Sequence, residues 1–139
     1  MPLLLVLEDT PADLRRAADI ARRAGFTEFE VHTYSSAAQV YLDKAMRRMV
    51  PMPDAMVIDL ELGIESGFEL LRFWHSTPKL RPIPVIIWTV SGAHQREICE
   101  LFKVYRFVSK EDDPGVLMET LASIIQNPPA SSPSPSVPD

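Results

Sequence analysis

Cysteine is almost absent from this sequence, which has one, Cys99, among 139 residues. A single cysteine has no partner within the chain, so intramolecular disulfides are excluded as a source of stability. A domain of this length folds without such cross-links, because roughly two thirds of the unfolded chain's surface can be buried. We therefore expect one globular domain in a reducing, cytoplasmic compartment.

Long hydrophobic runs and an excess of basic residues are missing too. No apolar stretch approaches the roughly 20 residues that a membrane helix needs, and the opening MPLLLVLED has neither the basic start nor the cleavage site of a signal peptide. Lysine and arginine number 14 against 19 aspartates and glutamates, for a net charge of -5. Such a charge gives no general attraction to polyanions. We expect no membrane insertion, no secretion and no binding to nucleic acid.

Short apolar runs of the kind that form buried strands are present at residues 3–7, 55–58, 83–88 and 104–108. A fifth segment, residues 28–33, alternates polar with apolar side chains, which predicts a more exposed strand at a sheet edge. The intervening segments carry apolar residues at helical spacing. Helix starts are predicted at Thr10-Pro11 and Asp113-Pro114, where a capping residue precedes a proline, and near Ser35, Ser66 and Gly92.

Alternation of strands with helices predicts an α/β fold with a parallel sheet, because parallel neighbours need a crossover long enough to hold a helix. Five such units suit a doubly wound sheet with the first strand at the centre and the third beside it. We expect this domain to cover residues 1–126. Residues 127–139 are mainly Pro, Ser and Ala without periodicity, and they are predicted to form a disordered tail.

Polar side chains follow the predicted strands at the edge where an open α/β sheet places its ligand site. Glu8 and Asp9 follow the first strand and Asp59 follows the third, so the expected strand order brings three carboxylates into one crevice. Burial and like charge disfavour ionisation of such a cluster, and a hard divalent cation such as Mg²⁺ removes that conflict. Thr89 and Lys110 add a hydroxyl and a cation suited to a phosphoryl group. The set predicts a phosphoryl-acceptor site with an aspartate nucleophile.

Four segments together resemble the receiver domain of two-component response regulators. They are LLVLED at 4–9, MVIDLELGIESGFELL at 56–71, PIPVIIWT at 82–89 and RFVSK at 106–110. The resemblance covers about residues 3–126, and it is specific because the segments occur in the family's order and at family-like spacing. It implies a flavodoxin-like (βα)5 fold, with a five-stranded parallel sheet of order 2-1-3-4-5, in a single-domain regulator similar to the chemotaxis type.

The resemblance also implies roles for the acidic residues. Asp59 matches the residue that is phosphorylated in the family. Asp9 and Asp59 match the residues that bind Mg²⁺ directly, and Glu8 matches a residue that assists through water. Glu61, two residues after Asp59, is expected to contribute its backbone carbonyl to the same ion.

Further roles follow from the same resemblance. Thr89 is expected to hydrogen-bond the phosphoryl group and Lys110 to pair with it. Phe107 stands at the aromatic rotamer switch, and Gly67 matches the glycine after the phosphorylation loop. The implied donor is a sensor histidine kinase or a phosphotransfer protein. The implied output is an interaction with an unidentified effector protein through the fourth helix, fifth strand and fifth helix.

Several positions depart from the family pattern. Lys110 precedes Glu111 where the family usually has a proline in a cis peptide. Without that proline the bond between Lys110 and Glu111 could be trans, and the Lys110 side chain could then point in a different direction. Val90 replaces a small residue after Thr89, and its branched side chain could narrow the approach to the site. Arg106 stands where DNA-binding relatives often have an aspartate used in dimer salt bridges, so that kind of dimer is not expected.

These observations favour a signalling switch that phosphorylates and dephosphorylates itself at Asp59 and is not an enzyme with an independent substrate. The alternative is a phosphorylation-independent pseudo-receiver, an interaction module that keeps the fold. A flavin mononucleotide carrier or small phosphatase is less favoured, because the loop after the first strand is acidic and lacks a Ser/Thr/Gly-rich phosphate cradle.

Overall fold

The computed structural model describes residues 1–62, 66–90 and 93–128, so most of the predicted tail, residues 129–139, lies outside the described residues. Strands and helices alternate along this part of the chain, as the sequence predicts. The strands are β1 (Leu3–Leu7), β2 (Glu28–His32), β3 (Ala55–Ile58), β4 (Val85–Thr89) and β5 (Arg106–Ser109). The helices are α1 (Pro11–Ala24), α2 (Ser35–Met46), α3 (Phe68–Ser76), α4 (Ala93–Leu101) and α5 (Pro114–Gln126).

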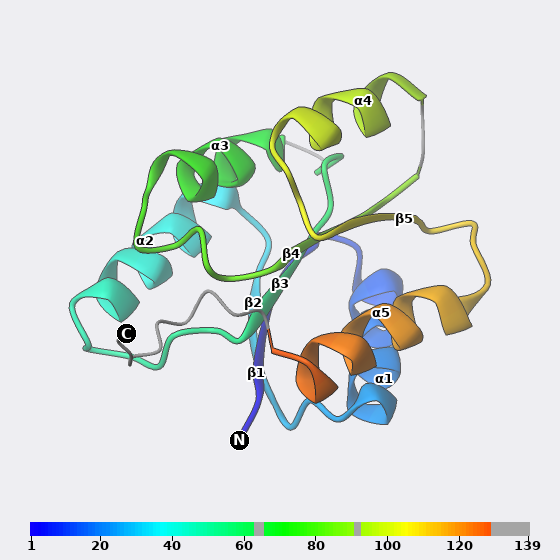
Figure 1. Cartoon of the computed structure of the whole chain (residues 1–139), viewed down its shortest axis with the longest axis horizontal. Coiled ribbons are helices and arrows are strands. Elements are labelled where there is room, and N and C mark those ends of the chain that lie inside the picture. The colour runs from blue at the N-terminus through cyan, green and yellow to red at the C-terminus, as the bar shows by residue number, and fades with distance from the viewer. Residues whose placement is uncertain (63–65, 91–92, 129–139) are drawn as a thin grey trace.

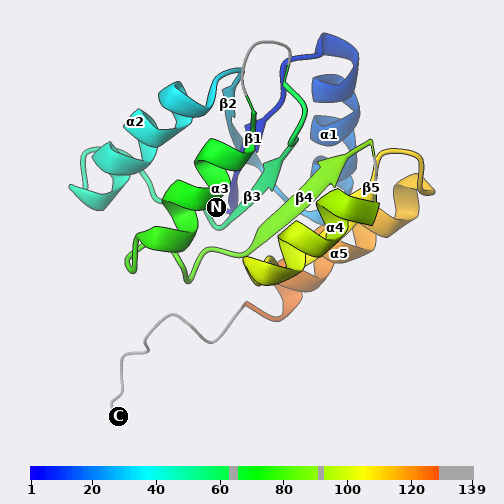
Figure 2. The same ribbon diagram turned by 90° about the horizontal axis from the view of Figure 1, so that it is seen from above.

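The strands form one parallel sheet in the order β2-β1-β3-β4-β5, which runs across the molecule in Figure 2. This is the predicted order, with β1 paired to β2 on one side and to β3 on the other. All residues of β1, β3 and β4 are buried, whereas β2 is part-exposed at the sheet edge, as its alternating sequence predicts. The order matters for function because it sets the ends of β1 and β3 side by side.

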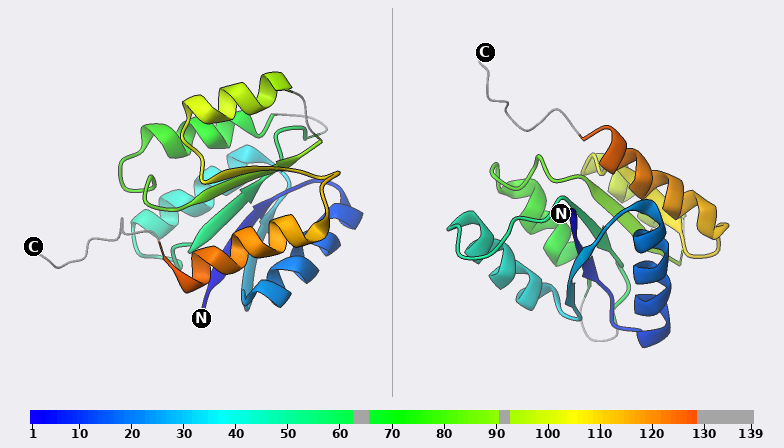
Figure 3. Two further views of the ribbon diagram at one scale, coloured as in Figure 1. Left: turned by 45° about the vertical axis from the view of Figure 1, so that its right-hand side comes forward. Right: turned by 90° about the horizontal axis from the view of Figure 1, so that it is seen from below.

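Helices cover both faces of the sheet, as Figures 1 and 3 show. Helices α1 and α5 lie together on one face, and α2, α3 and α4 lie on the other. Alternate β1 side chains supply the two cores: Leu4 and Val6 pack on the α1 and α5 side, and Leu5 and Leu7 pack on the opposite side. Among the described residues, no helix is long and apolar enough to cross a membrane.

Several predicted element boundaries are wrong by one or two residues. The predicted strand 83–88 begins at Val85, because Pro84 has no N–H to donate to a sheet ladder. The predicted strand 104–108 begins at Arg106, since Lys103 turns the chain with a φ of 58°. The segment 28–33 ends at His32.

Two predicted helix starts also shift, to Phe68 and Ala93 in place of Ser66 and Gly92. Ser66 instead pairs with Glu61 in an isolated antiparallel bridge, and its hydroxyl accepts a hydrogen bond from the Phe68 N–H at 3.0 Å. Gly92 lies outside the described residues. The start near Asp113 is confirmed, because its carboxylate accepts from the Gly115 N–H at 2.8 Å.

Cys99 on α4 is a buried structural thiol, with 1% of its surface exposed. Burial raises the pKa of this thiol to about 11, so almost none of it is the reactive thiolate at pH 7. We expect no labelling of the folded chain by a thiol reagent within the time that labels the denatured chain fully. Thiol titration with and without denaturant measures this, and equal labelling rates would contradict it.

Candidate functional site

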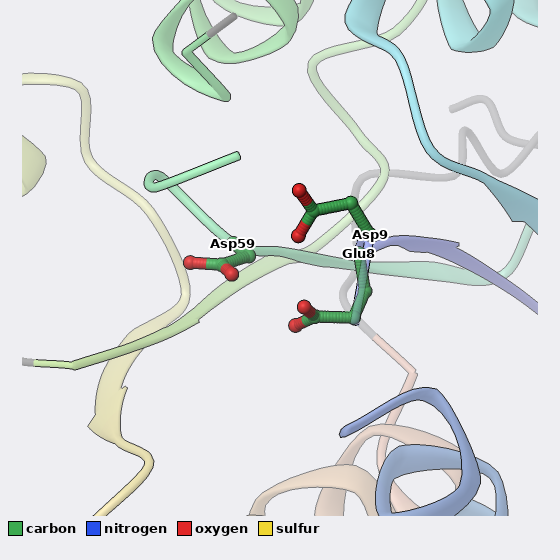
Figure 4. A group of neighbouring side chains, drawn as sticks. All are labelled: Glu8, Asp9 and Asp59. Carbon is green, nitrogen blue, oxygen red and sulfur yellow. The ribbon is translucent and has the colours of Figure 1, made fainter. Parts of the chain in front are cut away.

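Three carboxylates meet at the carboxyl edge of the sheet, as Figure 4 shows. Glu8 and Asp9 directly follow β1, and Asp59 directly follows β3, where its N–H donates to the Leu7 carbonyl at 3.0 Å. One carboxylate oxygen from each of the three residues lies within 4.8 Å of the others. Glu8 and Asp59 are buried, at 1% and 3% exposure. The three carboxylates therefore lie together as the strand order predicts, and two of them are removed from water.

Asp59 receives donors from three parts of the chain. Its Oδ1 accepts from the Thr89 hydroxyl at 2.7 Å and from the Glu61 N–H at 3.0 Å. Its Oδ2 accepts from Lys110 Nζ at 3.0 Å. Thr89 is fully buried at the end of β4, and the Lys110 N–H donates to its carbonyl at 2.9 Å. The ends of β3, β4 and β5 thus orient one carboxylate.

The Lys110 ammonium lies among three carboxylates. Its Nζ is 2.7 Å from Glu8 Oε1, 2.8 Å from Asp13 Oδ2 and 3.0 Å from Asp59 Oδ2. Burial alone lowers the pKa of Lys110, but these hydrogen bonds and the charge of Asp59 outweigh burial and raise it above its ordinary value. Lys110 therefore remains a cation at any physiological pH.

Glu8 and Asp13 respond in opposite directions to this environment. Burial raises the pKa of Glu8, and the nearby charge of Asp59 adds to the rise, while the hydrogen bond from Lys110 opposes it. The hydrogen bond from Lys110 lowers the pKa of Asp13, which is more exposed than Glu8. The site is thus an acidic cluster held together by one lysine.

The departures at Glu111 and Val90 leave this geometry intact. The described residues contain no cis peptide bond, so the Lys110 to Glu111 bond is trans, and Lys110 Nζ still reaches Asp59. Val90 is half-exposed beside the buried Thr89.

The structure places two other predicted residues less directly. Glu61 contacts Asp59 through its N–H, and the predicted metal contact of its carbonyl stays a prediction. The Glu61 side chain accepts from Gln95 Nε2 of α4 at 3.0 Å. Phe107 on β5 is partly buried, with the Arg96 guanidinium 4.6 Å from its ring centroid, and its switch role also stays a prediction.

Sequence reasoning missed Asp13 and Arg16 of α1. Asp13 accepts a hydrogen bond from Lys110 Nζ. The Arg16 guanidinium donates to Asp13 Oδ1 at 3.2 Å and to the Lys110 carbonyl at 3.4 Å. The guanidinium of Arg16 and Lys110 Nζ each lie 5.2 Å from the ring centroid of Trp88. The available signal was position, because the first turn of a helix that follows β1 begins at the same edge as the other acids.

Many solved structures similar to this chain are response regulators. A Mn²⁺-bound response regulator, Rcp1, is 22% identical with a TM-score of 0.74, over 98% of this chain and 100% of the other. The phosphorylated cyanobacterial phytochrome response regulator RcpA is 22% identical with a TM-score of 0.75, over 97% and 99%. A response regulator receiver domain from Rhodospirillum rubrum is 25% identical with a TM-score of 0.70, over 88% and 89%.

No protein-family model matches the sequence, and no curated protein matches it as a relative. The similarity is therefore one of three-dimensional structure, and it extends over nearly the whole chain. It agrees with the observed strand order. The chain has the flavodoxin-like fold of response regulator receiver domains.

Proposed function

We propose that this chain is a response regulator receiver whose Asp59 accepts a phosphoryl group from a sensor histidine kinase or a phosphotransfer protein in the cytoplasm. The observation that carries the proposal is the joint placement of a buried aspartate, a hydroxyl and an ammonium. Thr89 Oγ1 and Lys110 Nζ contact different oxygens of Asp59, beside two further carboxylates. An aspartate that merely ends a strand would not have a hydroxyl, an ammonium and two further carboxylates around it.

The acidic cluster fits a hard divalent cation such as Mg²⁺. Glu8, Asp9 and Asp59 present only oxygen atoms, close enough for one ion to share, and such ions prefer carboxylate and water oxygens. Asp9 and Asp59 would hold the ion directly, Glu8 would assist through water, and the Glu61 carbonyl would add a ligand. When bound, the ion supplies positive charge that stabilises the anionic phosphoryl group.

The residues of the chain supply the remaining chemistry. An Asp59 carboxylate oxygen attacks phosphorus, an O–P bond forms, and the bond from phosphorus to the donor's histidine nitrogen breaks with its electron pair left on nitrogen. Lys110 faces the carboxylate that reacts and compensates charge on the phosphoryl oxygens. The Thr89 hydroxyl, which donates a hydrogen bond to Asp59 in this structure, would donate to a phosphoryl oxygen after transfer.

The structural effect of phosphorylation is then transmitted to the surface through β4, β5 and α4. Thr89 pairs in register with Ser109 of β5, the strand that carries Phe107, and Arg96 of α4 lies over the Phe107 ring. A movement of Thr89 towards a phosphoryl group therefore alters the packing under the α4–β5–α5 face, where an effector protein would bind. The chain acts as a switch that modifies only itself.

The test is the intact mass of the chain after incubation with acetyl phosphate and Mg²⁺. We expect one phosphoryl adduct on the natural chain and none on Asp59→Asn or in the presence of a chelator. Asp54→Asn is a matched control, because Asp54 lies at the opposite end of β3 and accepts from the Leu3 N–H at 2.8 Å. This variant should keep the adduct.

The same measurement separates the proposal from its alternative. An adduct that survives Asp59→Asn places the phosphoryl group elsewhere and refutes the assignment. No adduct on the natural chain, together with no measurable Mg²⁺ binding, favours a pseudo-receiver that signals without phosphate.

A further inference from the structure

Lys110 has a carboxylate partner that stands outside the predicted metal site. Its ammonium has three N–H groups and three carboxylate neighbours, Glu8, Asp13 and Asp59. Glu8 and Asp59 belong with Asp9 to the cluster that fits a cation, but Asp13 does not. Asp13 lies in the first turn of α1, and its contact with Lys110 joins that helix to the end of β5. The contact therefore serves the lysine and not the cation.

Asp13 is itself held in place by Arg16. The Arg16 guanidinium donates to Asp13 Oδ1 at 3.2 Å and to the Lys110 carbonyl at 3.4 Å, and it lies over the Trp88 ring. Lys110 Nζ lies over the same ring, and its side chain is only 9% exposed. Because Asp13 Oδ1 is bound by Arg16, Asp13 Oδ2 stays directed at the ammonium.

A bound divalent cation would compete with Lys110 for its partners. Glu8 and Asp59, which contact the ammonium, also belong to the cluster that would hold the cation, so two positive charges would share these carboxylates. Asp13 is outside this competition and can keep one charge-assisted hydrogen bond to Lys110 throughout. We propose that Asp13 is a positioning residue that holds the Lys110 ammonium at the site when a divalent cation occupies Glu8, Asp9 and Asp59. The part of this proposal that concerns phosphoryl transfer, in which the positioned Lys110 takes part, rests on the proposed function.

Helix α1 contains its own matched control. Asp19 pairs with Arg22 at 3.2 Å with the same three-residue spacing, and Arg22 lies 5.2 Å from the ring centroid of Phe29, as Arg16 lies over Trp88. Asp19 and Arg22 are exposed and take no part in the acidic site. Asp19→Asn removes the same charge and the same kind of ion pair without touching Lys110.

The experiment is a calorimetric titration of the full chain with Mg²⁺. We expect Asp13→Asn to raise the Kd for Mg²⁺ about tenfold, because Asp13 is one of three carboxylate partners of the ammonium before the cation binds and the one left to it afterwards. Asp19→Asn should change it less than about twofold, and Asp13→Glu, which keeps the carboxylate, should restore most of the affinity. In a Lys110→Met background, Asp13→Asn should also change the Kd less than about twofold, because the partner that Asp13 holds is gone.

The outcomes separate the positioning role from a general charge effect. An equal rise in Kd with and without Lys110 would show that Asp13 acts only through its field, and this would overturn the inference. No measurable Mg²⁺ binding by the natural chain would overturn it as well. If the effect of Asp13→Asn on the Kd for Mg²⁺ depends on Lys110 but acetyl phosphate gives no adduct, the inference holds and the proposed function fails. If an adduct forms at Asp59 but Asp13→Asn does not change the Kd, the proposed function holds and the inference fails.

Discussion

Replacing Lys110 with methionine is expected to lower the free energy of unfolding by about 3 kcal/mol at pH 7 in the presence of a chelator, the scale of a broken buried ion pair. The reason is that the single ammonium compensates Glu8 and Asp59, both buried, together with Asp13. Without it, the remaining carboxylates repel one another, and two of them, Glu8 and Asp59, are buried away from water. Denaturant unfolding of both chains measures the difference.

The loss should depend on pH in a defined direction. The folded-state pKa of Glu8 is raised above 4.5, so its ionisation costs stability as the pH rises through the folded pKa, and removing Lys110 raises that pKa further. Lys110 also lowers the pKa of Asp13, which stabilises the natural chain above the ordinary value of 3.8. The effect at Glu8 predicts that the two chains become more alike as the pH falls from 7 towards 4.5, whereas the contribution of Asp13 is lost only below its ordinary value of 3.8. Lys79→Met, at an exposed position, should cost little at either pH. A gap that widens in acid would contradict this explanation.

Gly67→Ala is expected to destabilise the chain by about 3 kcal/mol, because the added methyl group has no space. A Cβ atom on Gly67 would overlap the carbonyl oxygen of Asp59 and press on Ile58 Cγ2 at 3.1 Å. The Gly67 N–H donates to the Leu60 carbonyl at 3.1 Å, which links the glycine to the segment that follows Asp59. Any relief of the overlap must therefore displace the backbone of Asp59.

The conformation of Gly67 makes this a test of space alone. Its φ of -66° and ψ of -11° are open to any residue, so strain in the backbone dihedrals does not contribute. Gly115→Ala is the matched control, since the nearest atom to its added Cβ is a side-chain oxygen, Asp113 Oδ1, at 3.2 Å. We expect a cost below about 1 kcal/mol for Gly115→Ala. Equal unfolding midpoints for the two variants would show that the contact with Asp59 does not control stability.

The fold and the acidic crevice could be predicted because they depend on pattern. The buried runs of β1, β3 and β4 and the alternating β2 define which strands are central, and the connections then fix the order. Once β1 and β3 are neighbours, Glu8, Asp9 and Asp59 must meet, since each follows a strand of the same direction. No side-chain geometry was needed for that step.

The contacts of Lys110 with Asp13 and of Arg16 with Trp88 could not be predicted in the same way. They join α1 to the ends of β4 and β5, and they depend on the rotation of α1 against the sheet and on long side chains with many rotamers. The sequence showed Asp13 only as an acid in the first turn of a helix, where acids are common. The trans bond after Lys110 is a different case, because it follows from Glu111 standing where the family usually has a proline.

The position of Trp88 gives this chain a built-in optical reporter. Trp88 and Trp74 are its only tryptophans, and they pack in different cores on opposite faces of the sheet. Two cations, Arg16 and Lys110, lie over the Trp88 ring, whereas the Trp74 indole donates to the Ile83 carbonyl at 3.0 Å, far from the acidic crevice in the fold. Indole emission responds to nearby charge, so in a Trp74→Phe chain the fluorescence of Trp88 would follow the ammonium of Lys110 without an attached label.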